Sequence, residues 1–402
     1  MDRSKKVLFV SIQGAMGHVT RDLAIARELR RAVPGVEIAW LAHRQAAQWL
    51  ARRGETVLPE VEHVGDYNVL GSRIVNDFRL DLVGYIRITA HARRANARLV
   101  ERVQRERRFA LVVGDEIYET MAALAAGEIR IDCPVVMIED FLRVEALGWN
   151  PLVRLAVWRI NRRRLQELER TAAQVTHLFV GEPEDIPAGR YGFLLSRCRD
   201  VARRHYRVIG HVVRFDPAEL RDREALRRKL GYGPGPLVIC ATGGTAAGKE
   251  LLALCGRALP LLRREMPDLQ VTFVCGEVYR TAPPELPPGA TCHRFLDNIE
   301  EHYAACDLAV VVGGGTTSIE LTALERPFLF FPLENQFDQQ INVAGRVARH
   351  GAGVRMEYRT TTPEELARAI RENLGRRVDA TGIPFDGARR GAQAIAELLD
   401  AA

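Results

Sequence analysis

The stretch VGGGTTSIELTALERPFLFFPLENQFDQQINVAG, residues 312–345, decides which fold this chain can adopt. It completes the apolar, β-branched run DLAVVV, which is typical of a buried parallel strand. Three glycines and three hydroxyl residues come next: Gly313, Gly314, Gly315, Thr316, Thr317 and Ser318. The glycines let the backbone turn tightly and approach a ligand. The hydroxyl residues open a helix, whose free N–H groups and dipole favour a phosphate. The stretch therefore predicts a strand, a turn and a helix that bind phosphate.

Polar side chains suited to a sugar follow the predicted phosphate site. Glu320 lies inside the predicted helix and can accept hydrogen bonds from ribose hydroxyls. After the apolar run FLFFP come five side chains that can hydrogen-bond sugar hydroxyls: Glu334, Asn335, Asp338, Gln339 and Asn342. We assign Asp338 and Gln339 to the sugar. The stretch as a whole predicts a site for a nucleotide-activated sugar.

Short apolar runs alternate with helical patterns along the whole chain. They are residues 5–12, 36–42, 110–114, 133–139, 175–180 and 206–209, and then PLVICAT, LQVTFVCG, ATCHRFL, DLAVVVG and PFLFFP. Such alternation predicts an α/β fold with parallel strands joined by helices. We expect two Rossmann-like, doubly wound domains, residues 1–212 and 213–385, that face each other across a cleft and bind ligands at the carboxyl ends of their strands.

The loop GAMGHVTR, residues 14–21, follows the first predicted strand. Its two glycines let the loop lie flat, with Gly17 near the donor and His18 at the mouth of the cleft. An imidazole ordinarily titrates near neutrality, so His18 is a candidate base for the hydroxyl proton of an acceptor. The alternative is that His18 only caps or packs at the helix start. Arg21 is expected either to hold phosphate or acceptor, or to lie on a solvated helix face.

A carboxylate that holds the other ring nitrogen would orient such a base. Asp115 directly follows the predicted strand FALVVG and is our candidate for this role. Glu116, Glu139 and Asp140 also follow strands and remain alternatives. Any of them could instead cap a helix.

The order of glycine turn, Thr/Ser, Glu, Pro-ended strand and Asp-Gln-x-x-Asn resembles the donor signature of inverting GT-B glycosyltransferases. That group includes the UDP-glycosyltransferases and the family-28 enzymes, among them the N-acetylglucosaminyltransferase of peptidoglycan assembly. Val312 departs from the pattern, because many UDP-glycosyltransferases have His there. The resemblance implies that His18 is the base, that Asp115 orients it, and that Phe295 and Leu296 hold the nucleobase. It also implies that a final helix, within residues 386–402, crosses back onto the N-terminal domain.

The segment CATGGTAAGKELL fits the pattern G-x-x-x-x-G-K from Gly243 to Lys249. A nucleotide-triphosphate loop would need Ser or Thr next, to hold Mg²⁺, and the chain has Glu250, which would repel phosphate. We instead expect Gly243, Gly244 and Thr245 to offer donors to a diphosphate. A simple strand–helix turn is the alternative.

Composition sets the broad class of the protein. The chain has 402 residues, which exceeds what one core usually supports, and 47% of them are hydrophobic. Its net charge of +6 allows anionic lipid, nucleic acid or an anionic nucleotide-sugar as partner. The seven cysteines are scattered, which predicts neither a disulfide framework nor a zinc site. We expect a cytoplasmic protein, because no apolar run is long enough to span a membrane.

The segment PLVRLAVWRINRRRLQELER, residues 151–170, is a predicted basic helix with a tryptophan. Its apolar residues recur near one face: Leu152, Leu155, Trp158, Leu165 and Leu168. Such a helix can rest on anionic lipid at the inner face of the membrane, or its apolar stripe can be core. Nucleic-acid binding is disfavoured, since no stacking platform accompanies the arginines.

These patterns favour an inverting glycosyltransferase that moves a sugar from a nucleotide diphosphate sugar, with UDP favoured over dTDP, to a hydroxyl of a lipid or small molecule. We expect no cofactor and no metal, because no Asp-x-Asp motif is evident and helix N-termini can neutralise the leaving diphosphate. The alternatives are a nucleotide-sugar 2-epimerase and a non-catalytic nucleotide-sugar-binding protein. The acceptor and the sugar leave no motif in the sequence.

Overall fold

The computed structural model describes residues 5–13, 16–65, 75–76, 79–80, 82–243, 248–276, 286–287 and 290–401. These residues fall into two compact units. Unit 1 comprises Met1–Gly71, Leu82–Arg214 and Pro384–Ala402, and unit 2 comprises Ser72–Asp81 and Phe215–Ile383. Gly244, Thr245 and most of the segment 66–81 lie outside the described residues.

Unit 1 contains a seven-stranded parallel sheet in the order β3-β2-β1-β6-β7-β8-β9. The strands are β1 (Lys6–Ser11), β2 (Glu37–Ala42), β3 (Thr56–Val57), β6 (Leu111–Asp115), β7 (Val135–Glu139), β8 (Val175–Val180) and β9 (Tyr206–Gly210). The helices are α1 (Met16–Ala32), α2 (Arg44–Ala51), α4 (Leu82–Arg107), α5 (Tyr118–Ala125), α6 (Pro151–Thr171), α7 (Cys198–His205) and α14 (Gly387–Asp400). The central strands are buried almost throughout, as their apolar runs predict.

Unit 2 contains a six-stranded parallel sheet in the order β12-β11-β10-β13-β14-β15. The strands are β10 (Leu237–Ala241), β11 (Gln270–Val274), β12 (Thr291–His293), β13 (Leu308–Val312), β14 (Phe328–Phe331) and β15 (Gly353–Arg355). The helices are α8 (Arg223–Leu230), α9 (Lys249–Glu265), α10 (Ile299–Ala305), α11 (Gly315–Ala323), α12 (Ala344–His350) and α13 (Pro363–Asn373). A separate antiparallel pair is formed by β4 (Val75–Asn76) and β5 (Arg79–Leu80).

Both sheets are doubly wound, which confirms the predicted fold class. In unit 1 the chain runs outward from β1 through β2 to β3, and then returns to β6 on the other side of β1. In unit 2 it runs from β10 through β11 to β12, and returns to β13 on the other side of β10. Each sheet therefore has one point where the strand order reverses, and ligands of such folds bind at the carboxyl ends of the strands there.

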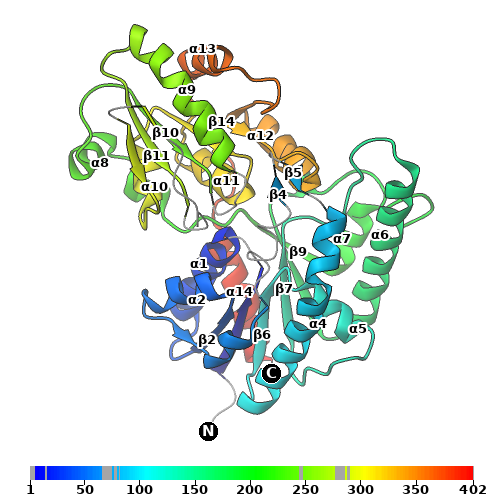
Figure 1. The fold of residues 1–402 in the computed structure, drawn as a ribbon. Helices are drawn as coiled ribbons and strands as arrows, with labels where there is room; N and C mark the ends of the chain where they lie inside the picture. The colour runs from blue at the N-terminus through cyan, green and yellow to red at the C-terminus, as the bar shows by residue number, and fades with distance from the viewer. Residues whose placement is uncertain are drawn as a thin grey trace. The chain divides into compact units, whose positions relative to one another are not determined.

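Helix α14 belongs to unit 1 although it follows unit 2 in the sequence. It packs against α1 and β9, and Figure 1 shows it in red beside the blue α1. A Cβ at Gly391 would lie 3.3 Å from Ile209 Cδ1 and 3.5 Å from Ile25 Cδ1, so a glycine allows this close packing. His211 N donates to Pro384 O at 2.8 Å and fixes the start of the segment.

Within the described residues, no helix combines the length and the apolar character that crossing a membrane requires.

Candidate active site

The predicted base and its partner lie at the switch point of unit 1. His18 is in the first turn of α1, directly after β1, and Asp115 is the last residue of β6. Strands β1 and β6 are neighbours, with Val10 paired to Gly114. The fold thus brings together two side chains that are 97 residues apart in the sequence.

The two side chains are in contact. His18 Nδ1 lies 2.9 Å from Asp115 Oδ1, which would leave Nε2 as the nitrogen available to a substrate. Asp115 is fully buried, whereas the His18 side chain is 20% exposed. The pair therefore has the arrangement of an oriented general base, with the carboxylate inside and one ring edge accessible. The catalytic roles of both residues stay predictions.

Arg21 completes this cluster, and sequence reasoning did not place it there. Its Nε and Nη2 donate to the two oxygens of Asp115 at 2.8 Å and 2.7 Å, and Nη1 donates to Asp140 Oδ2 at 3.0 Å. Its side chain is only 6% exposed, so the solvated helix face, one of the two alternatives for Arg21, is wrong. The spacing from His18, three residues along a helix, puts both side chains on one face and was the available signal.

The electrostatics of the cluster follow from burial and from Arg21. Burial alone would raise the pKa of Asp115, but the charge of Arg21 and the hydrogen bonds from His18 and Arg21 outweigh it and hold that pKa well below its ordinary value. The pKa of Asp140 is also lowered, by Arg21 against the effect of burial. Burial raises the pKa of Asp22 and of Glu116, and the neighbouring carboxylates add to the effect. Asp115 and Asp140 therefore stay ionised to lower pH than Asp22 and Glu116 do.

The alternative partners of His18 have other positions. Glu139 binds Arg164 and lies 2.8 Å from His177 Nδ1, so it belongs to a separate buried network. Asp140 reaches the cluster through Arg21.

His18, Asp115 and Glu116 each offer one potential metal-ligand atom, and these three atoms lie within 4.8 Å of one another. A metal ion can bind at such a spacing. The guanidinium of Arg21 already lies 2.7 Å from Asp115 Oδ1 and 3.1 Å from His18 Nδ1. A second cation at this position would be repelled, so the donor set does not fit a metal.

The predicted phosphate site lies at the switch point of unit 2. Gly314 is the N-cap of α11, directly after β13, with φ −72° and ψ 137° and no side-chain cap. The first N–H groups of a helix have no partner within it, so those of Gly315, Thr316 and Thr317 are available to an anion. The N-terminus of α11 thus offers converging donors and the positive end of a helix dipole.

Ser318 differs from its predicted role. Its hydroxyl donates to Gly315 O at 2.9 Å, its N–H donates to Gly314 O at 3.1 Å, and its side chain is buried. Both of its donors are used within the helix, which argues against a phosphate contact. Glu320, assigned to the ribose, lies one turn further along α11 and is 3% exposed.

The residues assigned to the sugar lie in a π-helical turn, η6 (Asp338–Val343). Asn342 Nδ2 donates to Asp338 Oδ1 at 2.9 Å. Gln339 Oε1 accepts from Leu333 N at 2.8 Å, which leaves the amide nitrogen of Gln339 as its remaining donor. Single π-helical turns often mark functional sites, because they turn side chains out of the regular helical register.

The remaining predicted donor residues are described in part. Gly243 follows β10 with φ +67°, a conformation that favours glycine. Gly244 and Thr245 lie outside the described residues, as do residues 14 and 15 of the loop before His18. Phe295 and Leu296 follow the edge strand β12 and are half-buried, with Leu296 packed against the core of unit 2.

Helix α6 is core at one end only. Leu168 is buried, but Leu152 is 75% exposed, so the predicted apolar stripe is divided between core and surface. Among the described residues, the exposed large apolar side chains belong to α6, to the residue just before it, and to the segment around Phe193, which Trp158 of α6 contacts. They are Trp149, Leu152, Val153, Leu155, Ile160, Phe193 and Leu194. We call them the α6 apolar surface. Sequence reasoning missed Phe193 and Leu194, which carry no periodic signal.

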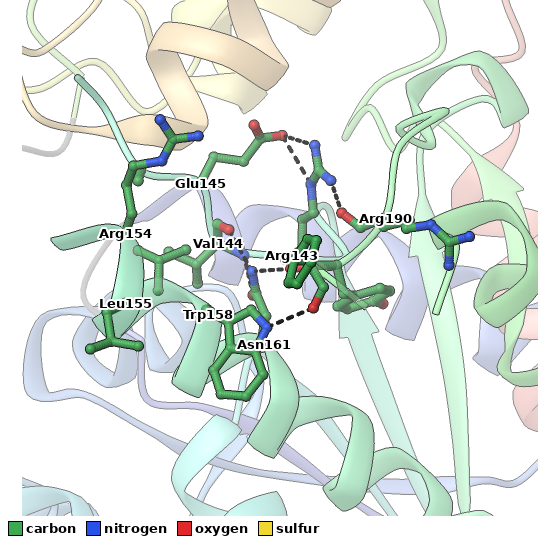
Figure 2. A pocket seen from close by; sticks show the side chains of 13 residues that line it. Arg143, Val144, Glu145, Arg154, Leu155, Trp158, Asn161 and Arg190 are labelled. Carbon is green, nitrogen blue, oxygen red and sulfur yellow. Dashed lines mark hydrogen bonds and ion pairs between the residues drawn. The ribbon is translucent and has the colours of Figure 1, made fainter. Parts of the chain in front are cut away.

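An open cavity of about 570 Å³ adjoins this surface, and Figure 2 shows its walls. Buried Asn161 ties the walls together, since its amide bonds to both main-chain groups of Val144 and to Tyr191 O, each at 2.9 Å. Trp158 Nε1 donates to Phe193 O at 2.9 Å on the outer side. The cavity is therefore fixed by hydrogen bonds of its own walls.

Comparisons with known proteins relate this chain to glycosyltransferases. The glycosyltransferase family 28 C-terminal domain matches residues 238–379, most of unit 2. An uncharacterised glycosyltransferase of Methanopyrus kandleri is 28% identical over 48% of this chain. The chain spans about half (54%) of the length of that relative. The UDP-N-acetylglucosamine–N-acetylmuramyl-(pentapeptide) pyrophosphoryl-undecaprenol N-acetylglucosamine transferase of Mycolicibacterium vanbaalenii is 30% identical over 44% of this chain and 45% of its own length.

The fold likeness extends over the whole chain. The solved glycotransferase of kitacinnamycin superposes with a TM-score of 0.59 at 17% identity and covers 100% of this chain and 98% of its own. The family match concerns residues 238–379 of unit 2, and the full-length superposition shows the fold of the whole chain. The chain therefore has the GT-B fold, and its residues 238–379 are similar to the C-terminal domain of the family-28 glycosyltransferases.

Proposed function

We propose that the protein is an inverting glycosyltransferase that moves a sugar from a UDP-sugar to a hydroxyl of a lipid-linked acceptor. One observation carries the proposal: each unit has its candidate groups at its own switch point, an oriented imidazole in unit 1 and a helix N-terminus in unit 2. The Mycolicibacterium relative supports the donor and acceptor classes, since its name gives a UDP-sugar and a pyrophosphoryl-undecaprenol acceptor.

In the proposed reaction, Nε2 of His18 takes the proton of the acceptor hydroxyl. At the same time, the oxygen of that hydroxyl forms a bond to the anomeric carbon of the donor sugar. The bond from that carbon to the diphosphate oxygen breaks, and both of its electrons leave with the UDP. Asp115 stabilises the imidazolium that forms. The N–H groups at the start of α11 would stabilise the departing negative charge, so we propose that no metal ion is required.

The α6 apolar surface supports a lipid acceptor. Four arginines near it, Arg154, Arg159, Arg162 and Arg190, form no ion pair with a carboxylate among the residues that the structure describes. Exposed apolar side chains beside cations suit the surface of an anionic membrane. We propose that this surface brings the enzyme to its acceptor at the membrane.

The test is calorimetric titration with UDP, dTDP, GDP and ADP in metal-free buffer, followed by assay of UDP-sugar turnover. Tight binding of UDP that is lost in Glu320→Ala, together with turnover lost in His18→Ala at unchanged UDP affinity, would support the proposal. If none of the four diphosphates bound, the proposal would be overturned. A new sugar formed from the donor alone would indicate an epimerase instead.

A further inference from the structure

Arg21 holds Asp115 in a fixed plane. The two parallel hydrogen bonds from Nε and Nη2 form a fork on the carboxylate, and the third bond to Asp140 fixes the guanidinium in turn. Such bidentate pairs are geometrically specific as well as strong. The oxygen that faces His18 Nδ1 is one of the two that the fork holds.

Arg21 also places a positive charge beside the His18 ring, with Nη2 3.1 Å from Nδ1. The titratable groups around the ring are Arg21 and Asp22 on α1, Asp115 and Glu116 at the end of β6, and Asp140 after β7. Asp22 and Glu116 have raised pKa values and so keep their protons to higher pH than ordinary carboxyls. Asp115 and Asp140, whose pKa values are lowered, are the carboxylates that stay ionised to lower pH.

We infer that Arg21 is a positioning residue for the His18–Asp115 pair: its fork orients Asp115, and its positive charge beside His18 Nδ1 opposes that of an imidazolium. The inference rests on the proposed function, in which His18 is the base. It also assigns Arg21 a role apart from the direct contact with phosphate or acceptor that its sequence position allowed.

The sign of the effect follows from the charges. Without Arg21, His18 would face two ionised carboxylates with no compensating cation, and the imidazole would hold its proton more tightly. The acidic limb of the pH–rate profile should then move to higher pH, by about one unit or more for a charge removed at this range. A residue that only supported the fold would lower activity without moving this limb.

The experiment uses Arg21→Gln, Arg21→Lys and the control Arg27→Gln, which removes an exposed arginine from the same helix. Release of UDP from UDP-N-acetylglucosamine by hydrolysis is followed from pH 5 to 9. In parallel, ring carbons of labelled histidines are titrated by NMR, with His18→Gln to assign the His18 signal.

Arg21→Gln should move both the acidic limb and the His18 titration midpoint upward, while Arg27→Gln should leave them in place. Arg21→Lys keeps the charge but loses the fork, so its limb should stay near that of the wild type while kcat falls about tenfold or more. If Arg21→Gln does not fold, an unchanged kcat in Arg21→Lys would overturn the inference.

The catalytic role of His18 and the positioning role of Arg21 can be refuted separately. If His18→Gln retains UDP release, the proposed base is wrong. If His18→Gln abolishes release and the profile and NMR titration of Arg21→Gln coincide with the wild type, only the role of Arg21 is refuted.

Discussion

Substituting Gly314 by alanine separates ligand binding from folding at the N-terminus of α11. A Cβ at Gly314 would meet no atom within 4 Å, and its φ of −72° and ψ of 137° suit alanine. At the preceding residue, Gly313, a Cβ would lie only 2.9 Å from the Cα of Pro332. The open space beside Gly314 is where a bound diphosphate would approach the helix.

The expected magnitudes differ for the two positions. Gly314→Ala should change the free energy of unfolding by less than about 1 kcal/mol, because the lower entropy of the unfolded chain favours alanine whereas the N-cap position favours glycine. In the complex, the added methyl group would push the diphosphate off the helix and weaken one or two charge-assisted hydrogen bonds worth about 1.5–3 kcal/mol each. The Kd for UDP should therefore rise by about 10- to 100-fold. Gly313→Ala should instead destabilise the fold, by about 1–3 kcal/mol, through overpacking.

The assay combines calorimetric titration with UDP and urea unfolding of each variant. Gly345→Ala serves as the control, since it makes the same change in α12 of the same unit, also with no atom within 4 Å. The reasoning would be refuted if Gly314→Ala bound UDP as tightly as the wild type, because no phosphate could then lie against the N-cap.

Three further outcomes are expected. Asp115→Asn should lower the free energy of unfolding by about 3 kcal/mol, because it leaves the buried Arg21 without its main counter-charge; urea unfolding at pH 7 measures it, and a loss below 1 kcal/mol would contradict the burial argument. Burial lowers the pKa of His302 from 6.5 to about 4. The stability from its neutral ring is fully present above pH 6.5 and is lost as the pH falls toward 4, so His302→Gln should flatten the pH dependence of unfolding over that range. Leu152→Ser with Phe193→Ser should reduce sedimentation with phosphatidylglycerol vesicles but not change UDP binding, and unchanged sedimentation would remove the α6 apolar surface from the membrane proposal.

The sheets were predictable from sequence because buried parallel strands are continuous apolar runs, and each predicted run in unit 1 coincides with a strand to within two residues at either end. The weaker strands escaped prediction. Strand β15 has only three residues, and two of them are half-buried, so its composition does not differ from that of a loop.

Side-chain partners were less predictable. The sequence indicated that His18 and Asp115 follow strands, and parallel topology made their contact foreseeable. It could not show that Arg21 turns inward, because an arginine on an amphipathic helix usually faces solvent. Ser318 shows the same limit, since a hydroxyl at a helix start can serve a ligand or the backbone, and only the rotamer decides.

The apolar stripe of α6 illustrates a third kind of limit. Periodicity shows that a helix has an apolar face, but whether the face is covered depends on distant segments that pack there. Leu168 is covered and Leu152 is not, although both fit the same stripe.

Helix α14 has a consequence for biosynthesis. Unit 1 needs this helix over α1 and β9, yet the ribosome makes it only after the whole of Phe215–Ile383. The C-terminal sheet is encoded without interruption and can therefore fold on the emerging chain first, while the N-terminal sheet waits with an uncovered apolar face. A chain that ends before α14 would therefore leave the unit that carries His18 without the helix that covers α1 and β9.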